Sequence, residues 1–437
     1  MTFCALSSAK GMDIKMKILW VSNSPIGPSA EILGKEYKGS SGGWIQSEYE
    51  ALDKTCYQMF FLSTLPSVKR GNVLHRKNEL GEVFCVNAPR LSYGINVPEI
   101  LQNNVQEIVD EIKPDIIQIW GTETWLSNAV SKCVTDAKKI IFIQGLIGVH
   151  KRYLGGYFEN SKEDKRYLKG ESLVCKLKTK LRKRNFLRQA DIEKETISNC
   201  KKVIVDSDFA KAYCSSISED IVCYNHILLP NSLFYQKKWN LEKCEKHTIF
   251  TVYGSSAEKG TQNLLKAVAI VRRKYPDVKV IIPGGYQLNR EGKLTPSKSD
   301  SFQNVMYNMI KELDLEDNVK FTGRLSTEQM ADTMEKCHLF VNPSCMEVHA
   351  LSLRESMIVG LPCISAQCGS VVEFLQHKVS GLLYRYEEYE SLAYYIDVLF
   401  SNSEICNDFS DRASKIFDKS DLKSLDLNRI YTNLFAE

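Results

Sequence analysis

Glu347 and Glu355 are the two residues whose type and spacing most clearly allow chemistry in this chain. They follow an apolar run that begins at Phe340, and Glu355 falls in a short helical pattern that Gly360 ends. A helix starting near Ala350 directs unpaired N–H groups and the positive end of its dipole out of the preceding loop, which suits an anion. Carboxylates accept hydrogen bonds from hydroxyl groups, so the pair suits a polyhydroxylated sugar. The alternative is that both glutamates are solvated helix charges.

This stretch resembles the donor-site signature of retaining glycosyltransferases of the family 4 type, which have the two-domain GT-B fold. The resemblance rests on the spacing Glu347-x7-Glu355 and on the pattern S-M-x-x-G-L-P-x-I over 356–364. It implies that Glu347 faces the donor hexose and that Glu355 holds the ribose hydroxyls. The backbone of three further residues is implied to meet sugar and phosphate: His349, Ala350 and Leu351. The family usually has a tripeptide such as GFG at 348–350, where this chain has VHA.

Length and composition indicate a globular protein with two domains. At 437 residues, 43% of them hydrophobic and 25% charged, the chain is too long for one ordinary core. No window approaches the ~18 consecutive apolar residues of a membrane span, and the first residues do not resemble a signal peptide, so we expect a cytoplasmic protein. The fourteen cysteines are scattered without a C-x-x-C pair, which predicts reduced thiols and neither disulfides nor a zinc site. A net charge of +4 is too small to indicate nucleic acid.

Alternating strand and helix patterns predict an α/β protein. The apolar run 17–23 is typical of a first parallel strand, and further strand patterns alternate with helical ones in both halves. We expect doubly wound parallel sheets, whose ligands bind beyond the carboxyl ends of the strands. The resemblance implies a GT-B arrangement of two Rossmann-like domains that face a cleft. We place the acceptor-binding domain at 13–238, the nucleotide-sugar-binding domain at 246–415, and a final helix that crosses back at 416–437.

Two glycine-rich loops before helical patterns can bring the backbone close to a phosphate or sugar. The first contains Gly42 and Gly43 but lacks the Walker and G-x-G-x-x-G patterns, and a merely flexible loop is the alternative. The resemblance implies that both glycines lie against the donor diphosphate. The second, 254–260, places Lys259 where it can pair with a diphosphate. The family has an arginine where this chain has Ser255, so positive charge would come from Lys259 and the helix start, or from an arginine elsewhere.

Two predicted strand ends in the first half carry candidate acceptor residues, Glu123 and His150. Many relatives have a histidine near the position of Gln144, but a lone histidine is usually structural, and that alternative stays open. The sequence D-S-D at 206–208 superficially resembles the metal motif of a different, single-domain glycosyltransferase fold. A helix cap is the simpler interpretation of these residues. We therefore expect neither a metal nor any other cofactor.

The segment 171–189 concentrates positive charge. Leu173, Leu177 and Leu181 recur every fourth residue, and lysines and arginines fill the other faces of the predicted helix. Such a helix suits an anionic membrane surface, where each positive residue contributes about 1 kcal/mol. The alternative is a solvated helix whose leucine stripe packs on the protein.

Together these features predict a retaining, metal-independent hexosyltransferase, with Glu347 and Lys259 as its catalytic residues. We expect a nucleotide diphosphate sugar, UDP-linked, as donor, because fixed positive groups beside the leaving diphosphate would lower the barrier most. The basic segment favours a lipid-linked glycan as acceptor, as in capsule, O-antigen or exopolysaccharide assembly at the inner face of the membrane. One alternative is a sugar-nucleotide-binding protein without transfer activity. Another is a nicotinamide-dependent oxidoreductase, for which the dinucleotide fingerprint is missing.

Overall fold

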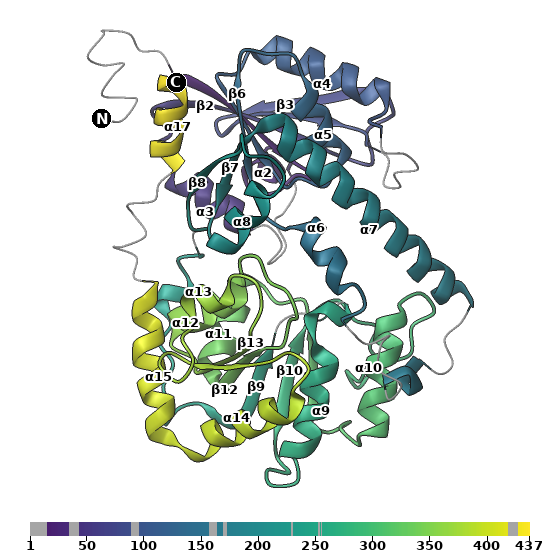
Figure 1. Ribbon diagram of the computed structural model, residues 1–437, viewed down its shortest axis with the longest axis vertical. Helices are drawn as coiled ribbons and strands as arrows, with labels where there is room; N and C mark the ends of the chain where they lie inside the picture. Colours follow the sequence, from purple (N-terminus) through teal and green to yellow (C-terminus); the bar gives the residue numbers. More distant parts are fainter. Residues whose placement is uncertain are drawn as a thin grey trace. The chain divides into compact units, whose positions relative to one another are not determined.

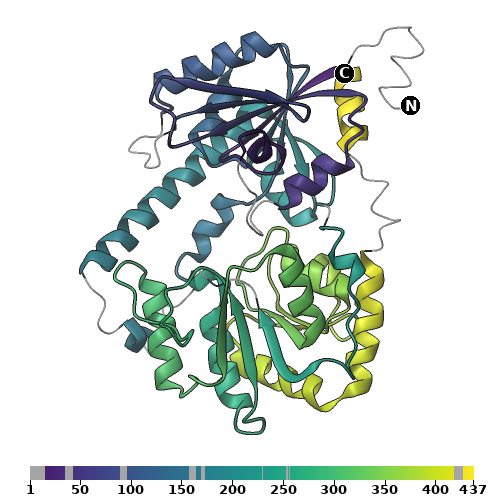
Figure 2. The ribbon, with the colours of Figure 1, turned by 180° about the vertical axis from the view of Figure 1, so that it is seen from behind.

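The computed structural model describes residues 15–34, 43–88, 96–156, 164–168, 173–228, 230–251, 254, 256–417 and 427–437. These residues form two compact units, each with a central sheet between layers of helices (Figures 1 and 2). Unit 1 comprises Met1–Lys151, Arg184–Leu229 and Leu422–Glu437, and unit 2 comprises Arg152–Lys183 and Pro230–Asp421. None of the helices in the described ranges is both long and apolar enough to span a membrane.

Unit 1 is built on an eight-stranded sheet in the order β3-β4-β2-β1-β5-β6-β7-β8. Its strands are β1 (Met16–Ser22), β2 (Tyr57–Thr64), β3 (Val73–Asn78), β4 (Gly81–Val86), β5 (Ile116–Trp120), β6 (Lys138–Phe142), β7 (Lys202–Val205) and β8 (Val222–Asn225). All pairs are parallel except β3 with β4. Because the strand order runs outward in both directions from β1, right-handed crossovers cover both faces with helices. The predicted central strand, 17–23, is confirmed as β1, and its side chains at Ile18 and Leu19 are fully buried.

The shorter helices of unit 1 are α2 (Pro28–Ile32), α3 (Gly43–Ala51), α4 (Glu99–Ile112), α5 (Trp125–Lys132), α6 (Ile147–His150), α8 (Asp208–Ser215) and α17 (Leu427–Ala436). The long helix α7 (Leu173–Cys200) contributes residues to both units. Ser207 caps α8, since its hydroxyl accepts a hydrogen bond from the N–H of Ala210 at 3.2 Å. This confirms the interpretation of the D-S-D sequence as a helix cap.

Unit 2 has a six-stranded sheet in the order β11-β10-β9-β12-β13-β14, and every pair in it is parallel. Its strands are β9 (Glu245–Thr251), β10 (Lys279–Pro283), β11 (Val319–Gly323), β12 (Cys337–Asn342), β13 (Cys363–Ala366) and β14 (Leu382–Tyr384). Its helices are α9 (Thr261–Val271), α10 (Ser301–Glu312), α11 (Thr327–Lys336), α12 (Leu351–Val359), α13 (Val371–Phe374), α14 (Tyr389–Ser401) and α15 (Ser403–Ile416). The order again reverses at a central strand, so the predicted α/β class with two doubly wound sheets is confirmed.

The compact units differ from the predicted domain ranges in the middle of the chain. Residues 152–183 pack in unit 2, where Asp164 pairs with Lys266 of α9 and the carbonyl of Tyr167 accepts a hydrogen bond from Asn308 at 2.8 Å. Sequence patterns alone could not show this, because these contacts join residues about a hundred or more positions apart.

The last helix, α17, packs in unit 1. Its residue Tyr431 is fully buried and accepts a hydrogen bond from the indole N–H of Trp20 at 2.8 Å. The Tyr431 hydroxyl in turn donates to Gln118 of β5 at 2.5 Å. The final segment of the chain is therefore tied to two central strands of the first sheet.

The cysteines of the described residues are free thiols, almost all of them buried, except for Cys56, which is disulfide-bonded. The prediction that every cysteine is reduced is therefore wrong at Cys56. Burial in apolar surroundings disfavours the thiolate, and it raises the pKa of Cys345, for example, to about 12.

Candidate active site

Three loops meet at the carboxyl edge of the unit 2 sheet. They follow β9, β12 and β13, which are adjacent and parallel, so their carboxyl ends lie side by side. The loop after β9 carries Lys259, the loop after β12 carries Glu347, and the loop after β13 carries Gly369. Residues from distant parts of the sequence are thus brought to one edge, where ligands of such folds bind.

Lys259 and Glu347, the two predicted catalytic residues, contact each other directly. The Lys259 Nζ donates to Glu347 Oε1 at 2.7 Å, and the Glu347 side chain is 13% exposed. Burial acts to lower the pKa of Lys259, but the charge of Glu347 and its hydrogen bond outweigh burial and raise it above its ordinary value. The lysine is therefore held charged and oriented beside the carboxylate.

Two glycines allow these loops to touch. Gly260 has φ +71°, and a Cβ there would lie 1.8 Å from the carbonyl oxygen of Pro343. Gly369 has φ +47°, and a Cβ there would lie 1.8 Å from the carbonyl oxygen of Glu347. That same carbonyl accepts the N–H of Ser370 at 3.2 Å. Any side chain at either glycine would push the loops apart and separate Lys259 from Glu347.

Helix α12 begins directly after this loop, at an unusual residue. Ala350 precedes the helix in the left-handed conformation, with φ 46° and ψ 44°, which strains a residue with a Cβ. Within the described residues no side chain caps the N-terminus of α12. Its first N–H groups and the positive end of its dipole are thus available to an anion. The neighbouring side chain of His349 is buried, at 6% exposed.

Glu355 lies one turn further along α12 and differs from the other carboxylates of this edge. It is half-buried, and within the described part of the chain no hydrogen-bond or ion-pair partner contacts its carboxyl group. Burial alone raises its pKa to about 8. A carboxyl group in this position lacks hydrogen-bond donors, and paired hydroxyl groups of a ligand would supply them.

The remaining predicted donor residues cannot all be placed. Leu351 is the first residue of α12, next to Ala350. Gly43 begins α3, but Gly42 and Ser255 lie outside the described residues.

The predicted acceptor residues lie in unit 1, at the carboxyl ends of β5 and β6, which are neighbouring strands. The Glu123 carboxylate accepts the backbone N–H of Thr122 at 2.9 Å. His150 ends α6, where its own N–H donates to the carbonyl of Leu146 at 2.8 Å. Both side chains are half-buried, so a ligand could reach them.

A buried glutamate that sequence reasoning missed organises the two loops that carry these residues. The Glu193 side chain, on α7, is fully buried and its carboxylate accepts four hydrogen bonds. The donors are the N–H groups of Ile147 and Gly148, both at 2.8 Å, the hydroxyl of Tyr213 at 2.7 Å and that of Thr122 at 3.1 Å. Burial raises the pKa of Glu193, although the hydrogen bonds from Gly148, Tyr213 and Ile147 oppose the rise. In the sequence Glu193 stands in a run of mixed charges, I-E-K-E, which resembles a solvated helix face.

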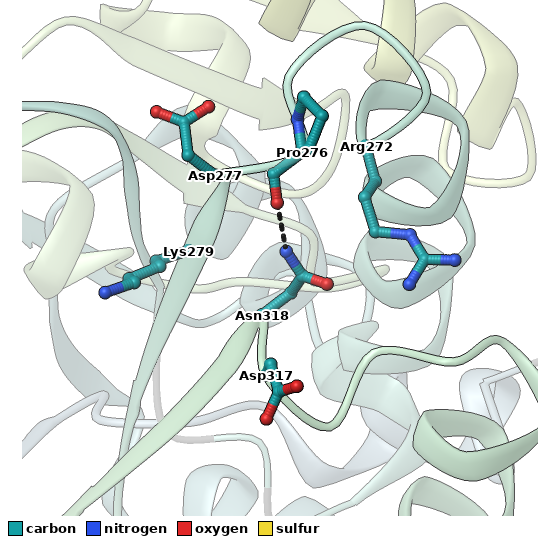
Figure 3. Close-up of a pocket in the computed structure, with 6 residues that line it drawn as sticks. All are labelled: Arg272, Pro276, Asp277, Lys279, Asp317 and Asn318. Atoms are coloured by element: carbon teal, nitrogen blue, oxygen red, sulfur yellow. Dashed lines mark hydrogen bonds between the residues drawn. The ribbon is translucent and has the colours of Figure 1, made fainter.

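A separate hollow lies away from these loops. It is lined by Arg272, Pro276, Asp277, Lys279, Asp317 and Asn318 (Figure 3). These residues surround the amino ends of β10 and β11, whereas the loops with Lys259 and Glu347 lie at the carboxyl edge of the same sheet. The amide of Asn318 donates to the carbonyl of Pro276 at 3.1 Å across it. This hollow is therefore not part of the candidate active site.

The segment 235–416, which contains Lys259, Glu347 and Glu355, matches the family model described as Glycosyl transferases group 1. This match covers 182 of the 437 residues of the chain. Over 221 residues the chain is 27% identical to an uncharacterized glycosyltransferase of Haemophilus influenzae, covering 50% of this chain and 56% of that relative. The chain spans about half the length of the curated relatives it matches.

Two solved structures resemble the whole chain. Sucrose-phosphate synthase from Thermosynechococcus elongatus has a TM-score of 0.70 at 17% identity and covers 97% of this chain and 100% of its own. HepE of Anabaena in complex with UDP-glucose has a TM-score of 0.61 at 16% identity. The match covers 96% of this chain and 98% of HepE. At such identities the likeness shows the fold, which is the GT-B fold expected from the sequence.

Replacing Glu355 by glutamine should raise thermal stability at pH 9 but not at pH 5. The Glu355 pKa is raised from 4.5 to about 8, so its contribution to stability is fully present below 4.5 and is lost as pH rises through 8. At pH 9 the wild-type carboxylate is ionised with no partner in the described part of the chain, whereas glutamine stays neutral. We expect a gain of a few degrees in Tm, since ~1 kcal/mol corresponds to about 2–4 °C in domains of this size.

Differential scanning fluorimetry at the two pH values measures this effect. Glu79→Gln is the control, because Glu79 is exposed and should show no difference between the two conditions. If Glu355→Gln followed the wild type at both pH values, the pKa of the Glu355 carboxyl group would not be raised to about 8.

Proposed function

We propose that this protein is a retaining glycosyltransferase of the family 4 type that moves a hexose from a UDP-sugar to an acceptor hydroxyl. The observation that carries the proposal is the arrangement at one sheet edge: the Lys259–Glu347 pair, and a start of α12 and a Glu355 carboxyl group that have no side-chain partner among the described residues. The group 1 family match over 235–416 supports it, and so does the likeness to a structure solved with UDP-glucose.

Each part of the donor has a matching group at this edge. The two ribose hydroxyls donate to Glu355, which must ionise to accept both hydrogen bonds. The diphosphate lies between the Lys259 ammonium and the N–H groups at the start of α12, near Ala350 and Leu351. Glu347 accepts a hydroxyl of the hexose, and the backbone at His349 meets the sugar. Gly42, Gly43 and Ser255 are assigned to the donor diphosphate by the family resemblance alone.

The chemical step depends on where charge develops. As the bond between the anomeric carbon and the diphosphate breaks, negative charge gathers on the leaving phosphate and the sugar becomes oxocarbenium-like. Lys259 and the α12 N-terminus are fixed beside that phosphate, so they stabilise the transition state more than the ground state. The acceptor hydroxyl attacks from the same face and gives its proton to the departing phosphate oxygen. This route retains the configuration and needs no protein nucleophile.

We further propose a lipid-linked glycan as the acceptor, used in the assembly of a surface polysaccharide at the inner face of a membrane. Glu123 and His150 would contact it, and Glu193 would hold their two loops in place. The exposed basic residues of segment 171–189 support an acceptor that is presented at an anionic membrane surface.

Replacing Lys259 by glutamine should lower turnover about 100-fold or more, because loss of one oxyanion-stabilising donor typically has an effect of 10²–10³. The assay is release of UDP from the best donor in a panel of UDP-, GDP- and ADP-sugars. Because Lys259→Gln removes the ammonium beside the Glu347 carboxylate, thermal unfolding of this variant and of the double variant Lys259→Gln/Glu347→Gln shows whether misfolding is responsible. Lys243→Gln, at an exposed position, is the matched control. Full turnover by Lys259→Gln would remove the lysine from the mechanism.

Dialysis against EDTA should leave turnover unchanged within about twofold. The physical reason is that Lys259 and the start of α12 supply the positive charge that a divalent cation provides in metal-dependent transferases. UDP release before and after dialysis, with and without added Mg²⁺ or Mn²⁺, measures this. A strict requirement for either cation would contradict the proposal and direct attention back to the D-S-D sequence at 206–208.

A further inference from the structure

We infer that the exposed face of helix α7 docks on an anionic lipid bilayer. Leu173, Leu177 and Leu181 lie at four-residue intervals and therefore on one face of the helix. Their exposed fractions are 84%, 60% and 49%. Val174 and Leu187, at 55% and 51%, extend the same apolar face. The leucines therefore face solvent, and the alternative in which this stripe packs on the protein is wrong.

A row of cations runs beside the leucines. Lys176, Lys180, Arg184 and Arg188 also follow one another at four-residue intervals, and the first three each lie three residues after one of the leucines. Side chains three and four residues apart are neighbours on a helix surface, so the apolar and cationic rows are adjacent. No acidic residue occurs between Leu173 and Ala190. The face is therefore apolar and positively charged throughout.

The opposite face of the same helix is the one that packs on the protein. Cys175 and Ala190 are buried, at 1% and 3% exposed, and Cys175 Sγ lies 3.4 Å from the carbonyl oxygen of Lys298. From Asp191 onward the helix acquires acids, and its residues Ile192 and Glu193 are buried. The apolar and basic face is thus confined to 173–188, the first 16 of the 28 residues of α7 and a length of roughly 23 Å at 1.5 Å per residue.

A lipid surface matches both properties of this face. Leucine side chains enter the boundary between headgroups and acyl chains, while lysine and arginine stems extend their charges to the lipid phosphates. Nucleic acid would neutralise the cations but leave the leucines in water. The helix therefore lies parallel to the bilayer plane. The proposed lipid-linked acceptor depends on the proposed glycosyl transfer. The contact between α7 and the lipid bilayer does not depend on it and can be tested separately.

Vesicle flotation tests this inference with the full chain. Wild-type protein should float with vesicles of equal parts phosphatidylcholine and phosphatidylglycerol, should float poorly with phosphatidylcholine alone, and should be released by salt. The triple variant Lys176→Gln/Lys180→Gln/Arg184→Gln should bind on the order of a hundredfold more weakly, from the loss of three cations near the leaflet. The double variant Leu177→Gln/Leu181→Gln should also lose binding.

Matched controls use exposed residues elsewhere. Lys69→Gln/Arg70→Gln/Lys211→Gln removes three exposed cations, and Val134→Gln removes an apolar side chain that is 83% exposed. Both should float like the wild type. Thermal stabilisation by UDP should be the same in every variant, and this separates failure of the lipid contact from failure of the donor site.

Flotation of either α7 variant at the wild-type level would overturn the inference. An equal loss of vesicle binding in the two control variants would also overturn it, because binding would then depend on overall charge or exposed apolar area and not on the α7 face. Wild-type binding to a DNA duplex without binding to vesicles would assign the face to nucleic acid and also overturn it.

Discussion

The contact between the loop after β9 and the loop after β12 is the constraint on which the candidate active site depends. Lys259 and Glu347 are 88 residues apart in sequence but 2.7 Å apart in space. They meet because two parallel strands lie side by side and because Gly260 and Gly369 leave room for backbone to touch backbone. The pair keeps a partly buried lysine charged while no ligand is present. It also fixes the direction in which an incoming diphosphate can meet that charge.

The three carboxylates of the two candidate sites differ in their hydrogen-bond and ion-pair partners. Glu347 is paired with a cation, Glu193 is saturated with four hydrogen-bond donors, and Glu355 has no partner in the described residues. A saturated carboxylate holds structure in place, whereas an unpartnered one is ready for ligand hydroxyls. The partners of each carboxylate therefore distinguish a residue that positions the site from a residue that binds the ligand.

The sequence patterns predicted the features that depend on nearby residues, such as the positions of strands and helix starts. The apolar run at 17–23 became β1, and the spacing of Glu347 and Glu355 placed them on either side of a helix start. The strand β3 is not evident from the sequence, because VLHRKN is mostly polar and its residues are exposed at a sheet edge. Glu193 was missed because burial of a charged residue depends on donors from three other segments. The orientation of the α7 leucines also depends on which face finds a packing partner, and periodicity alone cannot distinguish the two faces.

We propose that Glu355 receives the ribose hydroxyls of a uridine nucleotide as a carboxylate. Calorimetric titration with UDP at pH 7, in two buffers of different ionisation enthalpy, measures the proton that this binding would release. With a pKa of about 8, the empty site carries a proton on Glu355 at this pH and must release about one proton on binding. We expect this proton release in the wild type and its loss in Glu355→Gln. Equal proton release by the two proteins, or none by the wild type, would contradict it.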